Sequence, residues 1–242
     1  LGHHYQRDSI VMHADFLGDS FMLSQKAAES DAKYIIFCGV HFMAESADIL
    51  TSDEQVVMLP NLRAGCSMAD MATLVDVEAA WHEMLESTNL LDPINKHDPA
   101  AIAEDGESYL VPVTYMNSSA DLKDFVGRHG GIVCTSSNAE GILQWAFERA
   151  GPKGAVLFFP DQHLGRNTGL KMGISEHQMP TWVPGVGASS DLADARIILW
   201  HGFCSVHKRF KPSQIAEFRQ RHPDGHVVVH PECPRETVEV SD

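Results

Sequence analysis

Apolar segments of strand type alternate along this chain with segments of helical periodicity, and this alternation is the strongest constraint on its fold. Strands are expected at residues 33–38, 55–59, 110–114, 131–134, 155–159, 197–200 and 227–229. Helices are expected at residues 8–29, 43–50, 68–85, 120–126, 140–150 and 212–221. Strands separated by helices form parallel sheets through right-handed crossovers. The sequence therefore predicts an α/β protein made of three-layer units with short parallel sheets.

Three polar strings follow apolar runs of this kind: Gly-His-His-Tyr-Gln at 2–6, Tyr-Met-Asn-Ser-Ser at 115–119 and His-Pro-Glu-Cys at 230–233. Ligands of α/β proteins bind where the carboxyl end of a strand meets the start of a helix. We therefore expect His3, Tyr115 and His230 each to follow a parallel strand and to face a common centre. Because only Leu1 precedes the first string, its strand is expected to begin outside this sequence.

Matching strings predict an internal repeat. Residues 38–45 align with 134–140, and residues 59–63 align with 159–163. Repetition of a strand–helix unit is typical of a chain built from related units. We predict a first unit at 1–70, a second at 71–207 with insertions at 86–108 and 172–190, and the start of a third, incomplete unit at 208–242.

The charge of the chain excludes one class of partner. The formal net charge is −15, whereas nucleic-acid binding depends on clustered Lys and Arg. No run approaches the roughly 18 apolar residues of a membrane span, and no signal peptide is visible at the start of the sequence. We expect a cytoplasmic protein that contacts neither nucleic acid nor membrane.

The five cysteines fall into two groups. Cys38 and Cys134 close apolar strands and are expected in the core. Cys66 and Cys204 follow glycine-containing turns, where a thiolate is presented at the end of an element. From spacing alone, metal or cluster ligation and a purely structural role both remain open for these two residues.

Neutral hydrogen-bonding side chains gather at the predicted strand ends: Ser20, Tyr115, Asn117, Ser118, Ser136 and Ser137. Together with backbone N–H groups they suit an anion, although single Ser and Asn residues also serve as helix caps. His3 with Tyr5, and His230 with Glu232, are the acid–base candidates. The alternative for the second pair is a hydrogen-bonded loop histidine beside a solvated glutamate.

The strings together resemble quinolinate synthase, the iron–sulfur enzyme family of de novo NAD biosynthesis. The resemblance is carried by segments 2–6, 18–20, 37–45, 59–70, 115–121, 134–139, 159–167, 200–207 and 230–234. It implies three similar α/β domains around a pseudo-threefold axis and a [4Fe–4S] cluster held by one cysteine per domain. By motif, Cys66 and Cys204 are two of the ligands. The third is expected in a Cys-Pro context beyond residue 242, and the role is not transferred to Cys233.

The resemblance also implies a reaction, in which iminoaspartate condenses with dihydroxyacetone phosphate to give quinolinate. The cluster's open iron would act as a Lewis acid. The family's pocket-lining positions map onto His3, Ser20, Tyr115, Asn117, Ser136, His230 and Glu232. Tyr5 and Glu232 would transfer protons, with His230 as a further catalytic candidate. A functional link to the oxidase or dehydrogenase that makes iminoaspartate is expected.

Two other functions stay open at this point. One is a different cluster-dependent lyase or dehydratase, since Lewis-acid dehydration belongs to either chemistry. The other is a non-catalytic, truncated cluster protein, because the third unit is incomplete. We expect the 242-residue chain alone to hold no stable cluster and to make no quinolinate, since only two of the three thiolates are present.

Overall fold

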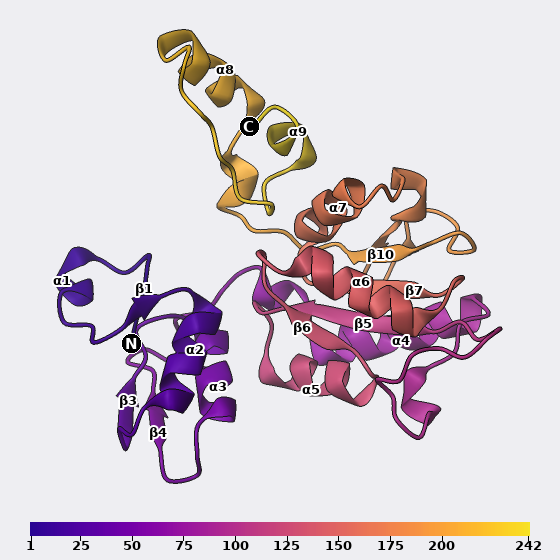
Figure 1. Cartoon of the computed structure of the whole chain (residues 1–242), viewed down its shortest axis with the longest axis horizontal. Coiled ribbons are helices and arrows are strands. Elements are labelled where there is room, and N and C mark those ends of the chain that lie inside the picture. Colours follow the sequence, from indigo (N-terminus) through magenta and orange to yellow (C-terminus); the bar gives the residue numbers. More distant parts are fainter. The chain divides into compact units, whose positions relative to one another are not determined.

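A computed structural model describes all residues, Leu1–Asp242, and the chain divides into two compact units (Figure 1). The first contains Leu1–Asp70 and Met116–Ala120, and the second contains Met71–Tyr115 and Asp121–Asp242. The predicted three-way division at residues 70 and 207 stays a prediction. None of the helices combines the length and the apolar character that crossing a lipid bilayer requires.

The first unit is a small parallel α/β structure. Its elements are β1 (Gly2–His3), α1 (Asp8–Val11), β2 (Leu17–Gly18), α2 (Ser20–Glu29), β3 (Tyr34–Ile36), α3 (His41–Leu50) and β4 (Val56–Met58). β1 pairs with β2 and β3 pairs with β4, all in parallel. A parallel bridge between Gly2 and Cys38, just beyond β3, joins the two pairs. The strand order is therefore β2-β1-β3-β4.

The predicted single helix over 8–29 is wrong, because the chain leaves the helix to form β2. The N–H of Gly2 donates to the Phe16 carbonyl at 2.9 Å, and the N–H of His4 donates to the Gly18 carbonyl at 3.2 Å. Asp19 then starts α2 as its N-cap, accepting the Met22 N–H at 2.9 Å. Pairing with β1 satisfies backbone groups that would otherwise be left free, and it outweighs the helical pattern of the side chains.

The second unit is larger. Its helices are α4 (Leu74–Ser87), α5 (Ala120–Arg128), α6 (Ala139–Ala150), α7 (Gln162–Lys171), α8 (Pro212–Arg221) and α9 (Arg235–Val238). Its strands are β5 (Leu110–Tyr115), β6 (Ile132–Cys134), β7 (Ala155–Phe159), β8 (Thr181–Val183), β9 (Gly187–Ala188) and β10 (Ile197–Trp200). Short 3₁₀ turns lie at Ala69–Met71, Pro93–Asn95, Glu176–Gln178 and His207–Arg209. α5 begins at Ala120, the last residue assigned to the first unit.

The six strands of the second unit form one sheet in the order β6-β5-β7-β10-β8-β9, parallel except for β9. One face packs on α4 and α5, with Trp81 and Phe125 meeting Leu157 and Trp200 in a buried cluster. α6 and α7 cover the opposite face (Figure 1). The central strands are buried on both sides, as expected for a parallel sheet between two helical layers.

Three further expectations need correction. The stretch 172–190, predicted to be irregular, holds β8 and β9 at the edge of the sheet. The helix predicted at 68–85 is a short 3₁₀ turn followed by α4, which starts at its N-cap Thr73. No strand forms at 227–229, where Val228 is 87% exposed and the N–H of Val227 donates to the Asp242 carboxylate. His230 therefore does not follow a strand.

The strand order of the first unit recurs in the second when the edge strands β8 and β9 are left out. Numbered along the chain without those two strands, β2-β1-β3-β4 and β6-β5-β7-β10 each read second, first, third, fourth. Cys38 thus follows a third strand while Cys134 closes a second one, so the predicted alignment of 38–45 with 134–140 is out of register. The missed strand β2 is the reason. Cys66 follows β4 and Cys204 follows β10, which hold the fourth place in this shared order.

Candidate functional site

The carboxyl edge of the six-stranded sheet carries the main cluster of polar side chains in the second unit. Tyr115 ends β5, Ser136 follows β6, Asp161 follows β7 and Cys204 follows β10. The order β6-β5-β7-β10 reverses direction between β5 and β7. In open α/β sheets, ligands bind at the carboxyl edge beside such a switch point.

Glu232 lies at the centre of this cluster and is only 3% exposed. Its carboxylate Oε2 lies 2.8 Å from Nδ1 of His207, and it accepts a hydrogen bond from the Tyr115 hydroxyl. Burial by itself would raise the pKa of Glu232, but the hydrogen bonds from His207 and Tyr115 outweigh it and hold the pKa below its usual value. The carboxylate is thus ionised although it is buried.

His207 and His230 stack with ring centroids 4.6 Å apart, yet they differ in charge. Hydrogen bonds to Cys204 and Glu232 raise the pKa of His207 to about 10. Burial lowers the pKa of His230, whose Nδ1 lies 3.7 Å from Glu232 Oε1. One imidazolium and one neutral imidazole therefore flank the same carboxylate at neutral pH.

Tyr115 is nearly fully buried and also hydrogen-bonds to Ser136. Burial and the neighbouring Glu232 charge both raise the pKa of its phenol, so the hydroxyl keeps its proton and donates a hydrogen bond to the Glu232 carboxylate. The predicted residues Tyr115, Ser136, Cys204, His230 and Glu232 thus all belong to one polar cluster of the second unit.

Asp161 connects this cluster to α7. Its side chain is completely buried, caps α7 by accepting the Leu164 N–H at 2.7 Å, and accepts the Cys204 N–H at 3.2 Å. Burial raises the pKa of Asp161 to about 7, against the lowering effect of these hydrogen bonds. The carboxyl group thereby fixes the backbone of the loop that presents the Cys204 thiol.

Asn167, on α7, holds the segment that carries His230 and Glu232. Its Nδ2 donates to the carbonyl oxygens of Pro231 at 2.8 Å and Cys233 at 2.9 Å, on either side of Glu232. No strand supports this segment, so the two hydrogen bonds from α7 replace the usual ladder in positioning Glu232.

The remaining predicted residues belong to the first unit. The rings of His3 and Tyr5 lie 3.9 Å apart, and the Tyr5 N–H donates to Nδ1 of His3 at 3.4 Å. Burial, with a contribution from His4, lowers the pKa of His3 to about 4. Burial, with a contribution from Cys66, raises the pKa of Tyr5 to about 12. Tyr5 is therefore a proton donor at neutral pH, and His3 is uncharged.

Ser20 is the first residue of α2 and lies two positions after the end of β2, just as Ser136 lies two positions after the end of β6. Asn117 and the fully buried Ser118 lie in Met116–Ala120, where the Ala120 N–H donates to the Glu45 carboxylate at 3.3 Å. Ser137 stays in the second unit and shares a hydrogen bond of 3.0 Å with the Thr135 hydroxyl.

The cysteines differ in their suitability as ligands. Cys66 and Cys204 are partly exposed in loops that follow β4 and β10. Cys134 is completely buried, and burial raises the pKa of its thiol. Cys233 is also buried, at 1% exposed. Cys66 and Cys204 are thus each an accessible thiol at the end of an element, which suits a ligand of the iron–sulfur cluster that the family resemblance implies.

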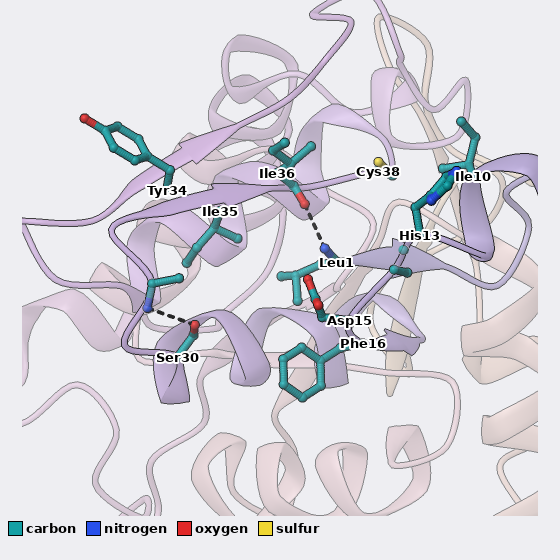
Figure 2. Close-up of a pocket in the computed structure, with 13 residues that line it drawn as sticks. Leu1, Ile10, His13, Asp15, Phe16, Ser30, Tyr34, Ile35, Ile36 and Cys38 are labelled. Atoms are coloured by element: carbon teal, nitrogen blue, oxygen red, sulfur yellow. Dashed lines mark hydrogen bonds between the residues drawn. The ribbon is translucent and has the colours of Figure 1, made fainter.

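A separate hollow of about 390 Å³ lies in the first unit between β1, β3 and the segment 10–16 (Figure 2). Its wall includes Ile10, Phe16, Tyr34 and Cys38, and the Leu1 amino group there donates to the Ile36 carbonyl at 2.8 Å. None of the predicted substrate or cluster residues lines it. The hollow is therefore not the site described above.

Comparison with known proteins decides the family. A family model described as "Quinolinate synthetase A protein" matches residues 1–242. This chain belongs to the quinolinate synthetase A family. Three curated quinolinate synthases, each aligned with the whole chain, are 56% identical over 247 residues in Corynebacterium glutamicum, 49% over 258 residues in Rhodopirellula baltica and 50% over 244 residues in Halobacterium salinarum. The resemblance predicted from the motifs is confirmed.

The alignments also show how much of a quinolinate synthase this chain represents. It spans 58% of the Corynebacterium protein, 61% of the Rhodopirellula protein and 60% of the Halobacterium protein. The quinolinate synthetase A chain described here is thus about three fifths as long as these relatives.

Sequence reasoning missed three residues that organise the site of this family member. Asp161 and His207 lie within the segments that carry the family resemblance, but the sequence analysis assigns no role to either. Asn167 sits in a helix that was not predicted. Its partners are 64 and 66 residues away, so no local sequence signal reveals them.

Proposed function

We propose that this chain is part of a quinolinate synthase, which condenses iminoaspartate with dihydroxyacetone phosphate to form quinolinate. The chain would supply proton-transfer groups, substrate-binding residues and two cluster ligands. Family membership across all 242 residues carries the proposal. The buried, ionised Glu232 between His207 and Tyr115 supports it, because proton transfer beside a carbonyl requires a base of this kind.

Glu232 and Tyr5 are the proposed proton-transfer groups. The Glu232 carboxylate accepts a proton from the carbon or nitrogen that must lose one during ring closure. The Tyr5 phenol, which keeps its proton at neutral pH, donates to the leaving oxygen. His230, held neutral, relays protons next to Glu232.

Substrate anions are held mainly by neutral donors in this proposal. Ser136 and Tyr115 follow the first two strands of the second unit, and Ser20 and His3 have the equivalent positions in the first. Asn117 adds an amide. His207, an imidazolium beside the carboxyl edge, balances the charge of a carboxylate or phosphate.

Cys66 and Cys204 would hold a [4Fe–4S] cluster together with a third cysteine outside the 242 residues. The cluster supplies Lewis-acid activation of a substrate oxygen when bound. Asp161 fixes the Cys204 loop for this purpose through the hydrogen bond to the Cys204 N–H. The partly exposed Cys66 thiol lies close enough to Tyr5 for its charge to affect the phenol.

We also propose that the two units are copies within a pseudo-threefold arrangement, the third being incomplete in this chain. The shared strand order supports a repeat. Cys66 follows β4 and Cys204 follows β10, which hold the fourth place in the shared order, and Ser20 and Ser136 both follow the second strand of their unit. We propose, finally, that the whole protein is a cytoplasmic transferase of pyridine nucleotide biosynthesis. Its iminoaspartate would be supplied by the oxidase or dehydrogenase that makes this compound.

The test uses the protein extended to the length of its relatives, reconstituted anaerobically with iron and sulfide. Glu232→Gln should lower kcat by roughly 10²- to 10⁴-fold, the usual contribution of a general base. The cluster absorbance should remain. Glu83→Gln on the exposed face of α4 is the matched control and should leave both unchanged. Quinolinate formation at the wild-type rate by Glu232→Gln would remove the assigned role.

A further inference from the structure

The helix α7 lies very close to the six-stranded sheet. A Cβ at Gly165 would be 2.6 Å from Leu199 Cδ2 and 2.7 Å from the ring of Phe158, so a glycine is what lets the helix approach β7 and β10. The next residue, Arg166, donates from Nη2 to the Thr181 hydroxyl of β8 at 2.9 Å. Close packing of this kind leaves a helix little freedom to shift. α7 is therefore a firm support for the segments that are hydrogen-bonded to it.

Two segments of the site are attached to this support. At the start of α7, the Asp161 carboxyl group accepts the Cys204 N–H at 3.2 Å. On the second turn, Asn167 Nδ2 donates to the carbonyl oxygens on either side of Glu232, at 2.8 Å and 2.9 Å. A side-chain amide has two N–H groups, and Asn167 uses both of them on this segment. One helix thus sets the position of Glu232 relative to the Cys204 loop.

We propose that Asn167 is a positioning residue for the reaction, which acts by holding the Glu232 carboxylate where it can take a proton from the substrate. The inference rests on the proposed function, in which Glu232 is the base. A base must come within about 2.6–3.2 Å of the atom that loses the proton. The other backbone hydrogen bonds of the segment are local, since the N–H groups of Cys233 and Glu232 both donate to His230. They shape the turn but do not fix it to the sheet.

The hydrogen bonds of Asn167 differ from those that the Glu232 side chain makes. His207 and Tyr115 bind the carboxylate itself. These two hydrogen bonds weaken when Glu232 takes up a proton, because an ionised acceptor binds roughly twice as strongly as a neutral one. The backbone carbonyls that Asn167 holds do not change their charge. Asn167 therefore keeps the segment in place in both protonation states of the base.

Kinetics of the protein extended to the length of its relatives test the proposal. Asn167→Leu keeps the approximate shape of the side chain, adds no charge and removes both donors. It should lower kcat by up to roughly 100-fold, the effect of moving a reacting group by about 1 Å, with little change in KM or in the iron–sulfur absorbance. Asn167→Gln keeps the amide and should retain more activity. The control Asn95→Leu, at an exposed asparagine, should leave kcat unchanged.

Two further measurements separate positioning from a general loss of structure. Adding Asn167→Leu to Glu232→Gln should cause no further fall in kcat, because the two residues act as one unit. Amide hydrogen exchange of the same extended protein, which needs no turnover, should be faster in Asn167→Leu at Glu232 and Cys233 and unchanged in β10.

The outcomes also separate this inference from the proposed function. Unchanged exchange at Glu232 and Cys233, a further fall in kcat in the double variant, or wild-type kcat in Asn167→Leu beside an impaired Glu232→Gln would overturn the role of Asn167 alone. Wild-type kcat in Glu232→Gln would instead overturn the proposed base, and with it the role of Asn167 in catalysis.

Discussion

Replacing Asp92 by Ala should be among the most damaging single changes outside the site, although Asp92 lies in the insertion predicted at 86–108. Its carboxylate accepts hydrogen bonds from Nε1 of Trp81 at 2.8 Å, from Nδ1 of His129 at 2.9 Å and from the N–H of Ile94 at 2.9 Å. Trp81 is 1% exposed and His129 is 8% exposed. Asp92→Ala would therefore leave two buried donors without an acceptor.

The magnitude follows from these three donors. A buried polar group left without its partner costs about 1–3 kcal/mol. The Trp81 and His129 donors fall in this class. The Ile94 N–H lies at an exposed turn and can rehydrate, so losing its cap costs about 1 kcal/mol. We expect Asp92→Ala to lower the free energy of unfolding by about 3–7 kcal/mol, with Asp92→Asn intermediate because it keeps one acceptor oxygen.

Urea unfolding of the 242-residue chain, followed by circular dichroism, measures this difference. The control is Asp98→Ala, since Asp98 is exposed and its side chain accepts only the Ala100 N–H, at 3.0 Å. Asp98→Ala should lower the free energy of unfolding by less than about 1 kcal/mol. Equal effects of the two substitutions, or a loss below about 1 kcal/mol for Asp92→Ala, would refute the reasoning.

The same network predicts a pH dependence. Burial alone would raise the pKa of Asp92, but the hydrogen bonds from His129, Trp81 and Ile94 lower it below the ordinary value of 3.8. An acid whose pKa is depressed on folding stabilises the native state above its unfolded pKa and loses that contribution as the pH falls through the folded value. The stability gap between the wild type and Asp92→Asn should therefore narrow below pH 3.8.

Three further predictions concern the cluster and the sheet. In the extended protein, Cys66→Ser and Cys204→Ser should each remove the iron–sulfur absorbance whereas Cys233→Ser should retain it; loss of the cluster in Cys233→Ser would contradict the ligand assignment. The 242-residue chain alone should bind no stable cluster and form no quinolinate after anaerobic reconstitution, which iron counting and a quinolinate assay would check. Gly165→Ala should lower the free energy of unfolding by about 1–3 kcal/mol in urea titrations, because its Cβ would lie 2.6 Å from Leu199 Cδ2 in the packed core.

The parts of the fold that the sequence predicted well are those where burial and periodicity agree. The strands at 155–159 and 197–200 and the helix at 212–221 are confirmed with the same ends. The two-residue strand β2 has no side-chain pattern of its own and depends on backbone pairing with β1. α7 was missed because Gly165 and Gly169 weaken its helical signal. Their lack of side chains is what allows α7 to approach Phe158 and Met179 closely.

The residues of the site also divide into those that a local motif indicates and those that only the folded chain brings together. Motifs indicated Tyr115, Cys204 and Glu232 because each lies within a recognisable string. The pairing of Glu232 with His207 joins residues 25 positions apart, and the Asn167 hydrogen bonds span more than 60. Such contacts depend on where α7 and the segment 230–233 come together in the folded chain. A single sequence gives no measure of how close these two segments lie in the folded chain.

The assignment of Met116–Ala120 to the first unit has a consequence for the order in which the chain becomes folded during synthesis. Domains generally fold as they emerge from the ribosome, the N-terminal one first. Here the first unit lacks its last segment until residue 120 has been made, 50 residues after Asp70 (120 − 70). By then β5 of the second unit has already been translated. The Glu45 carboxylate likewise has no Ala120 N–H to accept until that residue has been made. The first unit is therefore completed only after part of the second unit has been synthesised.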